Sequence, residues 1–212
     1  MTQPIEIPTS RYLLVLTSTA LLLVSLHLIL NLYHYQVGEV PWLLLQLFEL
    51  DEENNVPTWF SSFILLNNAI ALAIAFAQAS RHQWQWLVLG FGFLLLSVDE
   101  VAGLHETFHT AIDNNWTLYA AGLVALVGAS FVPFLLALPR PLAGGFILSG
   151  SIYLSGALLV EYLSRDMEEE SLRYAFAVAL EEGLEMAGAL LFLFINLKQQ
   201  RSVNPAVLIN FK

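Results

Sequence analysis

The chain of 212 residues contains no cysteine. This absence excludes disulfide bonds, a thiolate metal site and a cysteine nucleophile. Charged residues are also scarce, at 12% of the chain, which is about half of the ~25% that soluble domains carry. Because 57% of the residues are hydrophobic, the composition excludes a disordered chain and an ordinary cytosolic enzyme.

Basic residues are the scarcest charged type, with 8 Lys and Arg against 18 Asp and Glu, so the net charge is −10. Phosphate backbones repel a chain of this charge, which excludes nucleic acid as a partner. The sequence also lacks a Gly-x-Ser-x-Gly nucleophile motif, a phosphate-binding loop and a dinucleotide fingerprint. The chemistry must therefore be sought in the acidic side chains, which an apolar membrane chain has little reason to keep.

Six apolar segments are long enough to cross the ~30 Å hydrocarbon core of a bilayer, which needs about 20 helical residues. They are residues 12–35, 57–79, 84–108, 116–138, 142–164 and 172–197. Because the connections between them are short, we expect an all-α, polytopic integral membrane protein. Its six transmembrane helices would form one bundle and a single domain over residues 1–212, in contact with the lipid bilayer.

Two of the remaining features concern how the spans connect and pack. Residues 41–50 are apolar but too short to cross, so we expect a short interfacial helix between spans 1 and 2. Residues 142–164 are rich in Gly and Ser, which predicts a surface that another helix approaches closely.

The basic residues indicate the orientation, because Lys and Arg collect on the cytoplasmic side of a membrane. Six of them fall at one end of the expected bundle: Arg11, Arg81, Arg140, Lys198, Arg201 and Lys212. Only Arg165 and Arg173 fall at the other end, whereas all acids except Glu6 lie towards it. We therefore expect both termini, with a tail at 198–212, in the cytoplasm, and the protein in a bacterial inner membrane or a thylakoid-type membrane.

Acidic side chains inside membrane spans are costly and are therefore candidates for function. Asp99 and Glu100 fall in the outer third of span 3, and Glu161 lies near the outer end of span 5. Glu182 and Glu185 lie near the middle of span 6. Lys and Arg occur only at or beyond the ends of the spans, so protons, a metal ion or water in a cavity must stabilise these acids.

The spacing of the acids and histidines favours a metal centre. Glu106 and His109 are three residues apart and His105 and His109 four apart, so either pair can share a helix face. Carboxylate-bridged di-iron bundles use Glu-x-x-His pairs together with lone Glu residues. The predicted ligands are Asp99, Glu100, His105, Glu106, His109, Glu161, Glu182 and Glu185. Oxygen and imidazole ligands favour iron or manganese, with zinc as a secondary choice.

Four further residues are secondary ligand candidates. Asp51, Glu53 and Asn55 alternate like the start of a calcium loop, but Val56 and Ser62 replace the Gly and Glu that such a loop needs. Helix capping and solvation are the plainer interpretation of this segment. His27 is favoured as a hydrogen-bonded helix contact over a metal ligand.

Three functions stay open at this point. The first is a metal-binding, di-iron-like membrane protein, acting as an oxidoreductase on a lipid-soluble substrate. The second is a protein that moves protons or other cations through the same acids. The third is a non-catalytic accessory subunit of a larger membrane complex. The expected protein partners are either further copies of the chain, in a homo-oligomer, or other subunits of a membrane complex. In a purely structural alternative, protonated acids form a hydrogen-bonded network with Asn67, Asn68 and Ser97 and carry out no reaction.

Three acidic motifs carry a family resemblance. They are Phe48-Glu-Leu-Asp-Glu-Glu-Asn-Asn-Val-Pro-Thr-Trp-Phe-Ser-Ser62, Leu96-Ser-Val-Asp-Glu100 with His105-Glu106, and Leu180-Glu-Glu-Gly-Leu-Glu-Met186. In these motifs the chain resembles a family of uncharacterised bacterial multi-pass membrane proteins. The resemblance implies that the three motifs belong to one design, and it implies no particular activity.

Overall fold

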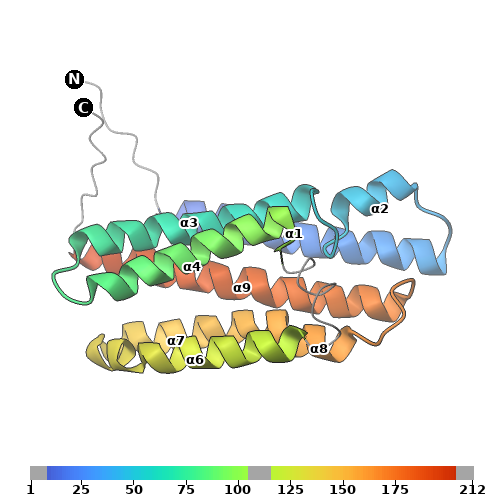
Figure 1. The fold of residues 1–212 in the computed structure, drawn as a ribbon. Coiled ribbons are helices and arrows are strands. Elements are labelled where there is room, and N and C mark those ends of the chain that lie inside the picture. The colour runs from blue at the N-terminus through green and yellow to red at the C-terminus, as the bar shows by residue number, and fades with distance from the viewer. Residues whose placement is uncertain (1–8, 105–115, 204–212) are drawn as a thin grey trace, which may run out of the picture.

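A computed structural model of the chain describes residues 9–104 and 116–203, and within them the fold is all-α (Figure 1). The longest helices are α1 (Thr9–Gln36), α3 (Val56–Gln78), α4 (Gln83–Ala102), α6 (Trp116–Ala137) and α9 (Leu172–Val203). A continuous helical segment joins α7 (Arg140–Leu154), the π-helical turn η1 (Ser155–Val160) and α8 (Glu161–Ser164). The short helix α2 (Trp42–Phe48) follows α1, where we expected an interfacial helix.

Five helices of the described chain are long and apolar enough to cross a membrane. They are α1, α3, α4, the part of α6 from Thr117 to Ala137, and the segment Arg140–Ser164. They correspond to the first five expected spans, so the all-α, multi-pass class is confirmed. α9 is longer, with 32 residues, but carries three glutamates and is not among these five. A sixth span remains a prediction.

Successive long helices run antiparallel, and α9 lies between the α3–α4 pair and the α6–α7 pair (Figure 1). α9 contacts α1, α3, α7, η1 and α8, and is therefore the central helix of the bundle. Because the helices alternate in direction, Arg11, Arg81, Arg140 and Lys198 lie at one end of the bundle. The helices α2 and α8 lie at the opposite end.

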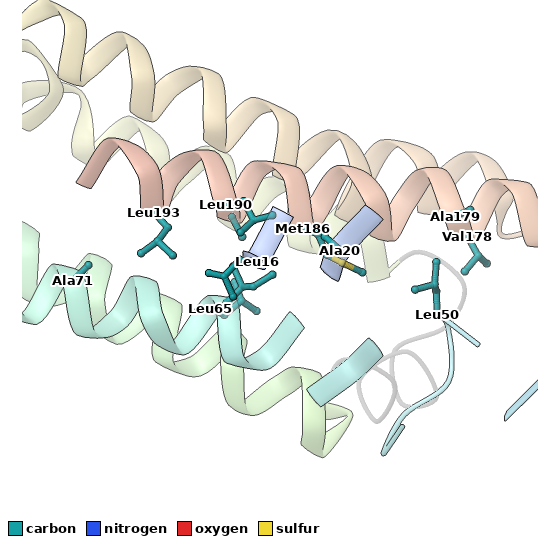
Figure 2. Close-up of a cluster of buried hydrophobic side chains, with 12 residues drawn as sticks. Leu16, Ala20, Leu50, Leu65, Ala71, Val178, Ala179, Met186, Leu190 and Leu193 are labelled. Carbon is teal, nitrogen blue, oxygen red and sulfur yellow. The ribbon is translucent and has the colours of Figure 1, made fainter. Parts of the chain in front are cut away.

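The core of the bundle joins α9 to α1 and α3 (Figure 2). Met186, Leu190 and Leu193 of α9 pack with Leu16 of α1 and Leu65 of α3, and all five side chains are buried. Lipid tails are as apolar as these side chains, so in a membrane such a core stabilises mainly through close packing.

Glycines allow the close approach predicted for residues 142–164. A Cβ atom at Gly145 would lie 2.7 Å from the side chain of Ile195, and one at Gly156 would lie 2.5 Å from the carbonyl oxygen of Glu181. The fit is mutual, because a Cβ at Gly188 would lie 2.5 Å from the backbone nitrogen of Tyr153. The packing of α7 and η1 on α9 confirms the prediction.

The third span differs from our expectation. We expected one helix over residues 84–108, but α4 ends at Ala102. Gly103 terminates it with a φ of 56°, a left-handed conformation that glycine adopts at low cost. The single α-helix that we expected over residues 84–108 is therefore interrupted at Gly103.

Candidate functional site

A cavity of about 630 Å³ lies between α4, α6, η1 and α9, at the end of the bundle that carries α2 and α8. Residues 50–53, which precede α3, form one part of its wall. Leu96 of α4, Val124 of α6 and Leu158 of η1 contribute apolar surface. A cavity of this volume is in the range of small-molecule and ion-binding sites.

Acidic side chains dominate the polar wall of this cavity. Ten carboxyl groups of the described chain line it, from Asp51, Glu52, Glu53, Asp99, Glu100, Glu161, Glu169, Glu181, Glu182 and Glu185. Arg165 is the only basic residue among the described residues that line the cavity. The excess of negative charge makes the cavity attractive to cations.

Five of the eight predicted metal ligands lie on this cavity. α4 contributes Asp99 and Glu100, α8 contributes Glu161, and α9 contributes Glu182 and Glu185. Their side chains are all partly buried. The structure thus brings together acids from three helices that are far apart in sequence.

The other three predicted ligands, His105, Glu106 and His109, lie outside the described residues. Within residues 9–104 and 116–203, no group of three or more His, Asp or Glu side chains is arranged to hold a metal ion. The described acids line the cavity wall from three helices, and a metal centre that includes them stays a prediction.

The π-helical turn η1 places the acids of α8 and α9 next to each other. A π-turn adds one residue to a helical turn and is frequent at functional sites. Here it precedes Glu161 directly, and its Gly156 lies against Glu185 as well as Glu181 of α9. Tyr153, in the last turn of α7, interacts electrostatically with Glu185.

The residues of the segment that resembles a calcium loop have two different roles. Asp51 and Glu53 line the cavity, and the hydroxyl group of Tyr174 donates a 2.5 Å hydrogen bond to Asp51. Asn55 instead caps α3, since its side-chain oxygen accepts a 3.1 Å hydrogen bond from the backbone N–H of Thr58. The capping interpretation is confirmed for Asn55.

Glu53 lies over the end of α4. An added Cβ atom at Gly103 would collide with the carboxylate of Glu53. Glycine is therefore required at position 103 for two reasons: its backbone is left-handed, and the carboxylate of Glu53 occupies the space that a side chain would need. This contact brings the segment before α3 to the cavity.

His27 is a hydrogen-bonded contact between helices, as favoured from the sequence. It is fully buried, and its Nε2 atom lies 3.0 Å from the carbonyl oxygen of Ala175. Its Nδ1 atom lies 3.0 Å from a carboxylate oxygen of Glu49. Because protein atoms contact both ring nitrogens, neither is directed towards the acidic cavity as a metal ligand.

The polar residues considered for a structural network bond to other partners. Ser62 and Ser97 donate to each other's backbone carbonyl oxygens, at 2.7 and 2.9 Å, and join α3 to α4. Asn68 donates to the carbonyl oxygen of Ala189 at 3.0 Å, and Asn67 accepts from Tyr12 at 2.7 Å. These bonds tie α3 to its neighbours.

Several residues of the cavity could not be singled out from the sequence. Thr117 of α6 is 5% exposed, lines the cavity, and its hydroxyl group has no hydrogen-bond partner among the described residues. Tyr153 and Tyr174 also line the wall. The only signal for the tyrosines was their position about two turns from an acid on the same helical segment.

Over residues 9–104 and 116–203, the fold and the cavity define a helical protein with five candidate membrane spans and an acidic site at one end of the bundle. Residues 12–199 match a family described as a domain of unknown function, DUF8692, and the chain belongs to this family. No curated protein and no solved structure matches the chain.

Proposed function

We propose that this chain is an integral membrane protein with six spans, of which α9 is the sixth. α9 is long enough to cross a bilayer, and its surroundings support this placement, because five helical elements contact it along the bundle. By the positive-inside rule, the basic end of the bundle faces the cytoplasm and both termini lie there. The acidic cavity then opens on the outer side of a bacterial inner membrane or a thylakoid-type membrane.

We infer that the acidic cavity binds cations. The observation that carries this proposal is that, among the described residues, ten carboxyl groups and a single basic side chain, Arg165, line one cavity. At an effective dielectric constant of about 20, one carboxylate ~5 Å from a monovalent cation contributes about 3 kcal/mol. The buried hydroxyl group of Thr117 provides a neutral oxygen on the same wall.

The depth of the acids suggests a path into the bundle. Asp51 and Glu53 lie in the segment before α3, and Glu181, Glu182 and Glu185 follow along α9. Directly beyond Glu185, Met186 and Leu190 belong to the apolar core. The cation would therefore enter from the acidic end, and transfer to the other side would require the core around Met186 to separate. Protons are the simplest cation that such a row of carboxyl groups accepts.

A metal centre is the second candidate function, and the convergence of Asp99, Glu100, Glu161, Glu182 and Glu185 on one cavity favours it. Iron or manganese would be the preferred metal and zinc the secondary one. A redox reaction on a lipid-soluble substrate would follow from such a centre. This candidate ranks second because the described acids include no group of three that could hold a metal ion.

The test compares wild type with a Glu182→Gln/Glu185→Gln variant in liposomes. Proton uptake is followed with an enclosed pH-sensitive dye, and Mn²⁺ binding is measured by equilibrium dialysis. We expect the variant to lose at least about tenfold in Mn²⁺ affinity, since two carboxyl groups that could bind the ion leave the cavity. Glu168→Gln is the matched control, because Glu168 is exposed in the loop before α9 and does not line the cavity.

The outcomes separate the candidates. Binding that is lost in the double variant and retained in Glu168→Gln supports a cation site, and proton flux with the same pattern supports translocation. Stoichiometric iron, manganese or zinc in protein purified without chelator supports the metal centre. Equal binding in all three proteins contradicts both.

A further inference from the structure

Two walls of the acidic cavity differ in their chemistry. The first belongs to α9, the central helix, which contributes Glu181, Glu182 and Glu185. The second, the α4–α6 wall, belongs to two helices that lie on opposite sides of α9 (Figure 1). Close backbone packing joins α4 to α3, and α6 to α7 and η1, but among the described elements it does not join α4 to α6. The two helices of the second wall therefore flank the cavity from different parts of the bundle.

The α4–α6 wall changes from polar to apolar along the bundle. On α4, Asp99 and Glu100 lie about one turn nearer to the end that carries α2 and α8 than Leu96 does. On α6, which runs in the opposite direction, Thr117 lies nearest to that end, and Val124 lies about two turns deeper. The polar groups of both helices thus lie at the same end of the cavity, with the apolar side chains deeper in the bundle.

The apolar part of this wall reaches the surface of the bundle. Leu96 is 37% exposed although it lines the cavity. The adjacent Leu95 is 48% exposed and does not line the cavity, so α4 also presents apolar surface outside it. Leu95, Leu96 and Val124 all lie inside candidate membrane spans. With the membrane placement proposed above, the cavity opens sideways to lipid between α4 and α6.

Aromatic rings join the same two helices nearer to the basic end of the bundle. The ring of Trp86 on α4 lies edge-on to that of Phe134 on α6, with centroids 5.1 Å apart. Trp86 also lies edge-on to Phe146 of α7, at 6.0 Å. All three side chains are buried in one cluster. The opening between α4 and α6 therefore belongs to the other half of the bundle, where both helices line the cavity.

The size of the cavity and one of its polar groups indicate what kind of ligand fits. A hydrated metal ion carries about six water molecules of ~30 Å³ each, which fill roughly a third of the 630 Å³ cavity. Thr117 is an independent observation, because its buried hydroxyl group has no hydrogen-bond partner among the described residues. A buried hydroxyl group without a partner is costly. A ligand with a hydrogen-bonding head and an apolar body would satisfy both observations.

We propose that the ligand of the acidic cavity is an amphipathic amine that enters from the bilayer between α4 and α6. This inference rests on the proposed function, because it names the class of cation that the cavity binds. The ammonium group lies among the carboxyl groups, as charge complementarity requires, and donates a hydrogen bond to Thr117. A phosphate beside the ammonium group would be repelled by the acids of the cavity, so the ligand carries no phosphate.

The alkyl chain of the ligand extends along Leu96 and Val124 towards the centre of the membrane. This is also the orientation of an amphiphile in a bilayer, whose polar head lies at the interface and whose chain lies deeper. The amine can therefore enter sideways without turning over. An inorganic cation would make no use of the apolar part of the wall.

Three small ligands, each differing from the next in one feature, test the proposal. Decylammonium has the charge and the long chain, butylammonium has the charge with a short chain, and decanol has the long chain without the charge. Each is dialysed to equilibrium at neutral pH against wild-type protein in phosphatidylcholine nanodiscs, and empty nanodiscs give the uptake by lipid alone. We expect saturable binding of decylammonium, at least about tenfold tighter than that of butylammonium, because the longer chain removes more apolar surface from water. Decanol should not exceed its uptake by empty nanodiscs.

Two pairs of variants locate the ligand in the cavity. Glu182→Gln/Glu185→Gln should lose at least about tenfold in affinity for decylammonium, because two acceptors for the ammonium group leave the cavity. Glu168→Gln, outside the cavity, should bind as wild type. Leu96→Trp should lose about fivefold or more, because the larger side chain occupies the space of the alkyl chain. Leu95→Trp, the same change at the adjacent exposed position, should bind as wild type.

The contrary outcomes are distinct from failure of the proposed function. Equal affinity for decylammonium and butylammonium, or full binding in Leu96→Trp, would overturn the amphipathic ligand, while Mn²⁺ binding that the double variant loses would still support a cation site. Decanol bound as tightly as decylammonium would show an apolar groove and overturn the amine. Protein that binds neither Mn²⁺ nor any of the three ligands would contradict the cation site itself.

Discussion

The hydroxyl group of Tyr174 donates a 2.5 Å hydrogen bond to a carboxylate oxygen of Asp51, 123 residues earlier in the chain. This bond joins the first turn of α9 to the segment that precedes α3, and both residues line the acidic cavity. It lies close to the contact between His27 and Ala175. Tyr174 and Ala175 are adjacent on α9, and they bond to Asp51 in the segment before α3 and to His27 on α1, respectively.

We expect Tyr174→Phe to lower the free energy of unfolding by about 1 kcal/mol. A hydrogen bond to a charged group contributes about 1.5–3 kcal/mol when shielded, and solvent reduces this value here because Asp51 is exposed. Denaturation of the detergent-solubilised protein measures the change. Tyr119→Phe, on the exposed face of α6, should have no effect, and equal losses in the two variants would contradict the prediction.

Gly156→Ala should destabilise the protein by about 1–3 kcal/mol, the usual cost of overpacking. The added methyl group would lie 2.5 Å from the carbonyl oxygen of Glu181, which belongs to helix backbone and cannot move alone. Gly150→Ala is the matched control, since nothing lies within 4 Å of a Cβ atom there. The control should be neutral or stabilising by up to ~1 kcal/mol. Thermal unfolding of both variants gives the comparison.

Gly103→Ala should destabilise through two separable effects. The left-handed backbone costs about 1–2 kcal/mol with any Cβ atom, and the methyl group also displaces the carboxylate of Glu53. Adding Glu53→Ala should therefore recover only the steric part of the loss. A double-mutant cycle on the free energy of unfolding measures both parts, and full recovery in the double variant would contradict the backbone part.

Thr117→Val and Thr58→Val should change stability in opposite directions. The hydroxyl group of Thr117 is buried without a partner among the described residues, so its replacement by a methyl group should stabilise by about 1 kcal/mol. Thr58 donates a 2.7 Å hydrogen bond to the carbonyl oxygen of Glu52, so its replacement should destabilise by a similar amount. Denaturant titration of the cation-free protein measures whether the free energy of unfolding rises in Thr117→Val and falls in Thr58→Val.

Under the proposed function, Thr117→Val also weakens cation binding. The hydroxyl group is a neutral oxygen on the cavity wall, and valine removes it without changing the shape of the side chain. We expect a severalfold loss of Mn²⁺ affinity by equilibrium dialysis. Unchanged affinity would place the cation away from α6.

Much of the fold could be predicted from the sequence because it depends on local properties. Long apolar runs such as residues 12–35 and 116–138 must form helices in lipid, since only helices satisfy every backbone polar group within one segment. The Gly- and Ser-rich surface of residues 142–164 indicated close helix packing, which Gly156 and Gly188 now show. The end of α4 was missed because a single glycine inside a long expected span, Gly103, does not by itself indicate a left-handed cap.

The type of candidate site could be predicted from the sequence, but the full set of residues that form it could not. Helical spacing placed Glu182 and Glu185 on one face of α9, because a helix repeats every 3.6 residues. It could not show that Asp51 and Glu53, read as a separate surface cluster, share a cavity with them. Side chains separated by many residues meet only through packing of whole helices, which no local pattern encodes.

The sequence alone determined the class of this protein, its helices, and the separation of bases from acids along the chain, because composition and periodicity are local. Only the tertiary structure decided which acids face one another. It also paired His27 with Glu49, since the fold of α2 back onto α1 is decided by packing between elements and not by local sequence. The excess of acids was visible in the composition, but its concentration around one cavity is a consequence of helix packing.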